Sequence, residues 1–340
     1  MARSMAERDM AEWDMAERDM PLEDPAAVPA GELASPSSVL PTTAAETTVG
    51  VEVVAMFGPT ASGKTEIAEK VATRLRTEVV SADAMQVYRG LPLLTNQPHR
   101  PTRLVAFCAP DEEMSVGAYA TLAHAEIDAL VARTGNAVVA GGTGLYLRAA
   151  LGELDVPPPA PPEVRARIER EVAADGLAAH ARLGAVDPAS AEAVHPHDRH
   201  RLVRALELFE SGRSLVHGQD RLWRAEVRRP TLVVGLAVPP DVLEKRIRRR
   251  TEQMFDRGVV SEVEQALAGA VSRTAAKTLG LREIVELDPD EALERIVIRT
   301  RRYAAYQRKW MRRMPGLIAL DATRTTDDVA DEIVRLAGSG

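Results

Sequence analysis

The chain has 340 residues, of which 45% are hydrophobic and 27% are charged, a composition typical of a soluble protein with one or two domains. No apolar run approaches the length of a membrane-spanning helix, so we expect no association with a membrane. The single cysteine, Cys108, excludes an internal disulfide and a cysteine-based zinc cluster, which fits a reducing cytoplasm.

The formal net charge of −7 comes entirely from the N-terminal segment. Residues 1–49 contain ten acidic and three basic side chains, whereas the remaining chain has 40 of each. The acidic total is therefore no argument against a polyanionic partner. The segment repeats the unit MAERD or MAEWD and continues into a stretch rich in Pro, Ala, Ser and Thr. We predict a disordered extension over 1–49, without the apolar region of a secretory signal.

A phosphate-binding loop follows this extension. Val53 to Phe57 is a wholly apolar run that predicts a buried parallel strand, and Glu66 to Leu75 predicts a helix. Between them lies a G-x-x-x-x-G-K-T motif, whose amides, lysine and helix N-terminus favour binding of a phosphate or diphosphate. The hydroxyl of Thr65 is the expected Mg²⁺ ligand. The expected binding residues are Gly58, Pro59, Thr60, Ala61, Ser62, Gly63, Lys64 and Thr65.

Two further strands complete an α/β pattern. Glu78 to Ser81 is a short predicted strand followed by Asp83, which either lies at the ligand-binding edge of the sheet or caps a helix. A predicted helix over 114–133 leads to the strand Ala137 to Ala140 and the glycine-rich sequence GGTGLY. This order predicts a doubly wound parallel sheet. The second strand ends without an Asp or Glu, which argues against nucleotide hydrolysis.

Five motifs occur in an order that is specific. They are GPTASGKT, SADAMQVYRG with TNQP behind it, GGTGLYLRAAL, HPHDRHRLVRALELFESGR and TRRYAAYQRKWMRR. Together they resemble the successive motifs of the tRNA dimethylallyltransferase (tRNA isopentenyltransferase, or IPP transferase) family, over about residues 51–320. The resemblance implies a P-loop NTPase-like fold that binds dimethylallyl diphosphate and prenylates N6 of the adenosine immediately 3′ of a tRNA anticodon.

The resemblance also implies roles for single residues. Asp83 would accept the N6 proton or orient the amine, Thr143 would lie beside the adenine, and Lys64 and Arg250 would stabilise the departing diphosphate. Arginine suits such a role because its planar fork binds phosphate oxygens in pairs. Within the second motif, the residues expected to contact tRNA are Asp83, Ala84, Met85 and Gln86.

A helical insertion is expected over 158–227, between the core segments 50–157 and 228–340. It follows the proline-rich run 157–162, and the sequence from Glu163 to Leu222 predicts helix throughout. We interpret the insertion as a tRNA-binding unit, although a solvated charged face is the competing explanation. The expected contacts are Arg165, His200, Arg201 and Arg204. A zinc site built from the neighbouring histidines is not expected, since no fourth ligand is apparent.

The C-terminal part returns to the sheet. Thr231 to Val238 predicts a strand, and the helix after it carries Arg250 and ends near Gly258. A basic segment over 295–313 is either an RNA-binding surface or a helix whose buried stripe is aromatic. The aromatic residues concerned are Tyr303, Tyr306 and Trp310. A strand over 317–320 and a helix over 326–336 are expected to close the fold.

Some positions depart from the family pattern, namely Leu94, Asn96, Gln97, Leu281, Ala305 and Tyr306. The TNQP form favours one rival, a cytokinin-type transferase that prenylates a free adenine nucleotide, but the insertion and the basic C-terminal helix argue against it. Two further rivals are a small-molecule P-loop kinase and a non-catalytic RNA-binding or NTP-switch protein. We expect a cytoplasmic monomer that uses Mg²⁺, dimethylallyl diphosphate and the tRNA anticodon loop.

Overall fold

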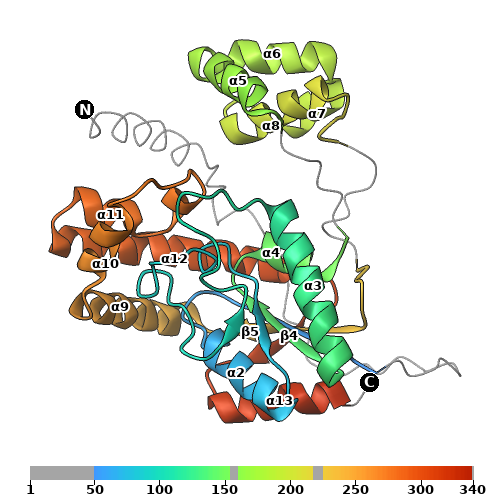
Figure 1. Ribbon diagram of the computed structural model, residues 1–340, viewed down its shortest axis with the longest axis vertical. Coiled ribbons are helices and arrows are strands. Elements are labelled where there is room, and N and C mark those ends of the chain that lie inside the picture. Colours follow the sequence, from blue (N-terminus) through green and yellow to red (C-terminus); the bar gives the residue numbers. More distant parts are fainter. Residues whose placement is uncertain (1–49, 154–159, 217–224, 339–340) are drawn as a thin grey trace, which may run out of the picture. The chain divides into compact units, whose positions relative to one another are not determined.

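The computed structural model describes residues 50–153, 160–216 and 225–338. Within these ranges the chain divides into two compact units, one formed by 160–216 and the other by 50–153 together with 225–338 (Figure 1). The extension predicted over 1–49 lies outside the described residues, as does the boundary expected at residue 158. No helix in the described part of the chain is both long and apolar enough to span a membrane.

A six-stranded parallel sheet forms the centre of the larger unit, with strand order β3-β2-β4-β1-β5-β6. The strands are β1 (Val53–Phe57), β2 (Val79–Ser81), β3 (Thr102–Arg103), β4 (Ala137–Gly141), β5 (Thr231–Ala237) and β6 (Ile318–Asp321). Phe57 pairs with Gly141 on one side and with Gly235 on the other. The loops that follow these three central strands therefore begin at one edge of the sheet, where open α/β sheets bind their ligands.

Alternate residues of β1 face two separate hydrophobic layers. Val54 and Met56 belong to the layer formed with α2 (Lys64–Arg74), α9 (Pro240–Asp256), α12 (Pro289–Arg313) and α13 (Thr326–Gly338). Val53, Ala55 and Phe57 belong to the layer formed with α3 (Val116–Thr134) and α4 (Gly144–Leu151). Strands with both faces covered are apolar along their whole length, which is why β1 is uninterrupted in apolar sequence. The predicted α/β class with a parallel sheet is confirmed.

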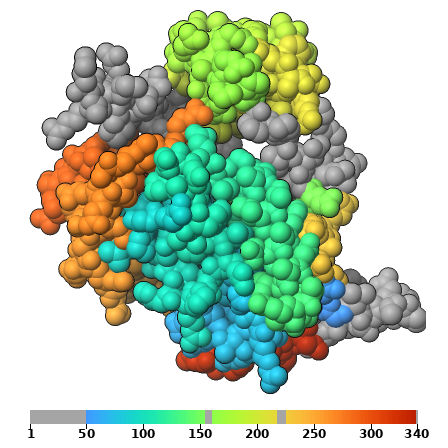
Figure 2. Space-filling view, viewed as in Figure 1, coloured from blue at the N-terminus to red at the C-terminus, as the bar shows by residue number. Residues whose placement is uncertain are grey.

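A smaller group of helices packs beside the segment that follows β2. It consists of α10 (Val259–Ala266), the 3₁₀ turn η2 (Ala275–Lys277) and α11 (Leu281–Glu286). Leu91 and Leu94 share a core with residues of these helices, and Figure 2 shows the corresponding colours side by side on the surface. Leu94, a departure from the family pattern, is thus a buried packing residue.

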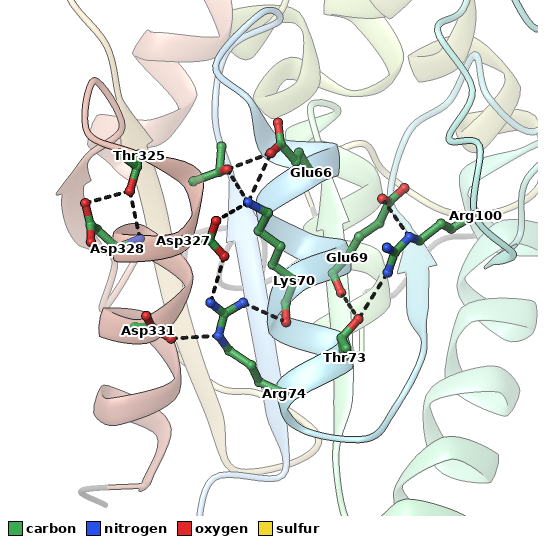
Figure 3. Close-up of polar contacts among 11 residues, drawn as sticks. Glu66, Glu69, Lys70, Thr73, Arg74, Arg100, Thr325, Asp327, Asp328 and Asp331 are labelled. Atoms are coloured by element: carbon green, nitrogen blue, oxygen red, sulfur yellow. Dashed lines mark hydrogen bonds and ion pairs between the residues drawn. The ribbon is translucent and has the colours of Figure 1, made fainter.

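Charged side chains connect α2 to α13 on the outside of the sheet (Figure 3). Lys70 donates to Asp327 at 2.6 Å, and Arg74 donates to Asp331 at 2.7 Å and to Asp327 at 3.0 Å. Single exposed ion pairs contribute little, but a network that shares Asp327 between two cations is better ordered. These contacts support the helix whose first residue is Lys64.

The smaller unit contains four helices around its own core. They are α5 (Pro162–Ala174), α6 (Gly176–Val186), α7 (Pro188–Ala193) and α8 (Arg199–Glu210), and their buried residues include Ile168, Leu183 and Leu202. The prediction of helix throughout 163–222 is therefore wrong. Asp175, Asp187 and Asp198 each accept a backbone N–H near a helix start, so the chain turns at these caps, and α8 ends at Glu210.

The boundaries of the other predicted strands and helices agree with expectation to within a few residues, except for the basic segment, whereas the short helices α4, α10, η2 and α11 were not predicted. The two-residue strand β3 carries no recognisable pattern and was not predicted. The basic segment 295–313 belongs to a longer helix, α12, which begins at Pro289 because Asp288 caps it through the amides of Asp290 and Glu291.

A buried carboxylate is central to the stability of the smaller unit. The fully buried side chain of Glu207 accepts from Arg165 at 3.0 Å and from Arg204 at 3.2 Å. Glu207→Ala removes the shared acceptor of two partly buried arginines and should lower the free energy of unfolding of this unit by roughly 2 kcal/mol. Amide hydrogen exchange along α8 in the full chain measures the change. The exposed Glu192 on α7 is the matched control, and equal protection in both alanine variants would contradict the expectation.

Candidate active site

The phosphate-binding loop connects β1 to α2 and has the backbone that its glycines allow. Gly63 has φ 89°, a left-handed conformation that turns the chain into the first residue of α2. A side chain at Gly58 would meet the Leu236 Cβ and the Ser62 Oγ, both at 3.0 Å. The loop is therefore packed tightly against β5, which fixes its amides next to the start of a helix.

Lys64 is the principal cation of the loop. Its ammonium donates to the carbonyl of Pro59 at 2.7 Å. Loss of water around the ammonium lowers the pKa of Lys64 to about 8; the Asp83 carboxylate opposes this change, and Arg250 adds to it. The loop thus holds a poorly solvated cation, whose charged form a nearby anion would favour.

Arg250 reaches the same loop from α9. Its Nη1 donates to the Thr60 hydroxyl at 2.8 Å, and burial lowers the pKa of this guanidinium. Arg246, one turn earlier on α9, donates to the Ala61 carbonyl at 3.4 Å. Two arginines of one helix therefore contact adjacent residues of the loop.

Asp83 lies just beyond β2 and does not cap a helix. Its Oδ1 accepts from the Met85 amide at 3.0 Å, which closes a turn rather than starting a helix. The hydroxyl of Thr143, at the start of α4, accepts from the Ala84 amide at 3.1 Å and so connects the two loops that carry the expected acceptor residues.

A small pocket at the edge of the sheet is lined by residues that the sequence separates. Lys64 and Thr65 come from the phosphate loop, Asp83 and Gln86 from the segment after β2, and Gly141 from the end of β4. Two hydrogen bonds fix the Gln86 side chain. It accepts from the Ser81 hydroxyl at 2.9 Å and donates to the Asn96 carbonyl at 2.9 Å. A larger groove between α9 and α12 contains none of these residues.

The second motif is connected to the C-terminal helices and to the TNQP loop. The sulfur of Met85 accepts from the Thr278 hydroxyl at 3.4 Å. Gln97 is one of the residues that depart from the family pattern. Its side chain donates to the Tyr88 carbonyl at 2.8 Å and so joins two parts of the segment that follows β2.

The candidate residues of the smaller unit differ in their surroundings. Arg165 and Arg204 both contact the buried Glu207, whereas His200 and Arg201 are exposed at the start of α8. The spacing of three between Arg201 and Arg204 therefore does not place them in the same environment. No group of three or more His, Cys, Asp or Glu residues that could hold a metal ion occurs among the described residues.

The basic helix α12 does not bury all of its aromatic residues. Its buried positions are Ala292, Ile296, Val297, Ala304 and Gln307. Tyr306 is 47% exposed, whereas Tyr303 and Trp310 are half-buried, so a stripe made of all three aromatic residues is not buried. Gln307 was not singled out in the sequence, although a polar residue three positions after a buried alanine is the one signal that could have identified it.

Fold and site together define a P-loop α/β protein whose phosphate loop is contacted by two arginines of a later helix. A family model described as IPP transferase matches residues 86–314, and one described as isopentenyl transferase matches residues 51–102. The tRNA dimethylallyltransferase of Anaeromyxobacter dehalogenans strain 2CP-1 is 39% identical over 284 residues, which are 78% of this chain and 92% of that protein. The protein of that name from Rhodopirellula baltica is 37% identical over 77% of this chain and 85% of its own length.

Solved structures agree with these matches. The tRNA isopentenylpyrophosphate transferase of Bacillus halodurans has a TM-score of 0.62 at 29% identity and covers 85% of this chain and 96% of its own. A eukaryotic dimethylallyltransferase acting on tRNA, with a TM-score of 0.66 at 23% identity, shares the fold over 80% of this chain and 74% of its own. The chain belongs to the IPP transferase family, that of the tRNA dimethylallyltransferases, as the order of its motifs predicted.

The lowered pKa of Lys64 predicts a pH dependence of anion binding. Affinity of the free protein for pyrophosphate should fall as the pH rises through about 8, because the ammonium then loses its charge. Isothermal titration calorimetry over a pH series measures this. Lys64→Met should remove the inflection, whereas Lys70→Met, a change on the same helix, should retain it; an identical pH profile in the two variants would contradict the assignment.

The same shift has a consequence for stability. The unfolded chain binds a proton at Lys64 up to the ordinary pKa of 10.5, whereas the folded chain releases it near 8. Stability contributed by this residue therefore rises with pH between these values. Lys64→Met should remove that rise and stabilise the ligand-free protein at neutral pH, as thermal unfolding at several pH values would measure.

Proposed function

We propose that this enzyme transfers a dimethylallyl group from dimethylallyl diphosphate to N6 of the adenosine immediately 3′ of the anticodon in tRNA, releasing diphosphate. Its curated relatives carry the name tRNA dimethylallyltransferase. The observation that carries the proposal is that one pocket is lined both by the cation and hydroxyl of the phosphate loop and by Asp83. Such a lining brings a cation that can stabilise a leaving diphosphate next to a carboxylate that can accept a proton.

The diphosphate-binding residues act on the leaving group. Negative charge grows on the diphosphate oxygen as its bond to the allylic carbon breaks, and fixed cations stabilise that charge. Burial lowers the pKa of Lys64 and of Arg250. A bound anion would favour the charged form of both side chains. The Ser62 hydroxyl is buried without a hydrogen-bond partner among the described residues, which suits contact with a phosphate oxygen. The backbone N–H groups of Gly63, Lys64 and Thr65, at the start of α2, complete the cradle.

Mg²⁺ is the cofactor that we assign to this site. Thr65 lines the pocket and offers one hydroxyl oxygen, and the lining also contains the carboxylates of Asp83 and Glu69. So few protein oxygens fit a magnesium ion that keeps several waters and is held largely by substrate phosphates. When bound, the ion supplies positive charge to the diphosphate; Lys64 and Arg250 supply theirs from the protein.

The acceptor side needs a base and an opening for the adenine. The exocyclic amine is a weak nucleophile, so we assign Asp83 to accept its proton as N6 forms a bond to C1 and the C1–oxygen bond breaks. Thr143, tied to the Ala84 amide, is assigned to the side of the adenine. The base must leave the anticodon loop to reach this pocket, as in other enzymes that act on bases. Ala84, Met85 and Gln86 are assigned to its surroundings.

The insertion, which we place at 158–227, is proposed to bind the tRNA. The exposed His200 and Arg201 are the stronger candidates for phosphate contacts, because Arg165 and Arg204 already contact Glu207. The basic face of α12 offers a second RNA-binding surface, on which Tyr306 is exposed for stacking. We further propose that the enzyme is a monomer and acts in the cytoplasm.

Asp83→Ala should reduce turnover by ~10² or more while tRNA remains bound, because it removes the proton acceptor without removing the RNA surfaces. Transfer of a labelled dimethylallyl group to unmodified tRNA measures turnover, and filter binding measures the complex. Asp111→Ala, an exposed change in the same unit, is the control and should retain wild-type turnover. Wild-type turnover in the Asp83 variant would reject the assignment.

One assay tests the proposed function itself. Purified protein with labelled dimethylallyl diphosphate is offered unmodified tRNA, AMP or ATP in turn. Transfer to tRNA alone is expected. Transfer to AMP or ATP would indicate a free-nucleotide transferase, and phosphate release from ATP without prenyl transfer would indicate a kinase or a hydrolase.

A further inference from the structure

Gln307 connects the two loops that border the pocket. This residue of α12 is 2% exposed, and its side chain makes two hydrogen bonds in opposite directions. Its Oε1 accepts from the Thr60 amide of the phosphate loop at 2.7 Å, and its Nε2 donates to the Gly142 carbonyl after β4 at 2.8 Å. A single primary amide therefore joins segments that lie more than eighty residues apart in the sequence.

The two bonds are well placed to resist displacement. A buried amide that loses one partner leaves a polar group unsatisfied, which costs about 1–3 kcal/mol. A Cβ at Gly142 would lie 2.4 Å from the Gln307 Nε2, so this residue must lack a side chain for the contact to form. The Tyr303 hydroxyl, one turn earlier on α12, donates to the same carbonyl at 3.4 Å.

The helix α12 packs in both hydrophobic layers of the sheet, and this packing fixes the position of Gln307. Ala304 packs in the hydrophobic layer with α2 and α9, whereas Trp310 packs against the opposite layer. A Cβ at Gly144 would lie 2.2 Å from the Trp310 ring, so the indole also rests on the loop that carries Thr143. Gln307 lies between these two anchors, where the helix crosses the carboxyl edge of the sheet.

We propose that Gln307 is a positioning residue that sets the spacing between the diphosphate loop and the Gly142–Thr143 loop. The inference rests on the proposed function, in which the first loop holds the prenyl donor and the second borders the adenine. The spacing then determines how closely the allylic carbon approaches N6. A misplacement of about 1 Å in such an arrangement slows a reaction by ~10²-fold.

The first test is Gln307→Leu, which retains side-chain volume and removes both hydrogen bonds. Single-turnover transfer at saturating substrates should slow by ~10-fold to 10²-fold. The affinities for tRNA and pyrophosphate should change little, and the melting temperature should fall while the protein stays folded at the assay temperature, because two buried polar groups lose a partner. Gln265→Leu, on the exposed face of α10, is the matched control and should retain the wild-type rate. An unchanged rate, or a loss confined to KM, would reject the positioning role.

A second variant reaches the same contact from the other side. Gly142→Ala places a methyl group where the Gln307 amide lies, and it should slow the same step. Because both changes break one contact, the double variant should be little slower than the slower single variant. Fully additive losses would show that the two residues act independently and would overturn the inference.

Gln307→Glu adds a pH readout that loss of folding alone does not produce. A protonated carboxyl accepts from Thr60 and donates to Gly142 as the amide does, whereas the carboxylate repels that carbonyl and attracts the nearby Lys64. The transfer rate relative to wild type should therefore recover as the pH falls, and a flat ratio would contradict the proposal. A wild-type protein that prenylates nothing overturns the proposed function and this inference together; an active wild type with an equally active Gln307→Leu variant overturns the inference alone.

Discussion

The crowding of cations around one loop is the constraint on which the rest of the site depends. Lys64 and Arg250 approach the residues between β1 and α2 from two helices, and burial lowers the pKa of both. Asp83 is the acidic neighbour that favours the charged form of each. Two buried cations close to one carboxylate favour an additional negative charge, which is the physical basis of the diphosphate site proposed above. The contacts that hold α2 in place must therefore offset the cost of burying two cations next to a single carboxylate.

Those supporting contacts come from the C-terminal half of the chain. The α13 helix contributes Asp327 and Asp331 to the outer face of α2, and α9 contributes the arginines that touch Thr60 and Ala61. The α12 helix crosses from one hydrophobic layer to the other and adds Gln307 at the crossing. A loop encoded within eight residues near the start of the fold is thus held by elements more than 180 residues later. This explains why the larger unit must close on itself before the site is complete.

Sequence reasoning succeeded where the pattern is local. The strand Val53–Phe57, the glycine loop and α2 follow one another directly, so spacing and residue type were sufficient to predict them. It could not reveal contacts between segments that are distant in the sequence. Arg165 resembles a phosphate ligand in sequence, and only the structure shows that it also contacts Glu207, 42 residues later, which Arg204 contacts as well. Gln307 was missed because its partner Thr60 lies 247 residues away.

The end of β4 gives the clearest link between packing and chemistry. Its last residue, Gly141, has no space for a side chain, because a Cβ there would lie 1.9 Å from the Ala82 carbonyl. An acidic residue at this strand end, where nucleotide hydrolases usually place one, would displace the segment after β2. That segment carries Asp83 itself, one residue after Ala82. The close packing therefore excludes an acidic side chain at the end of β4. The carboxylate that lines the pocket beside Lys64 and Thr65 is instead that of Asp83, in the loop after the neighbouring strand.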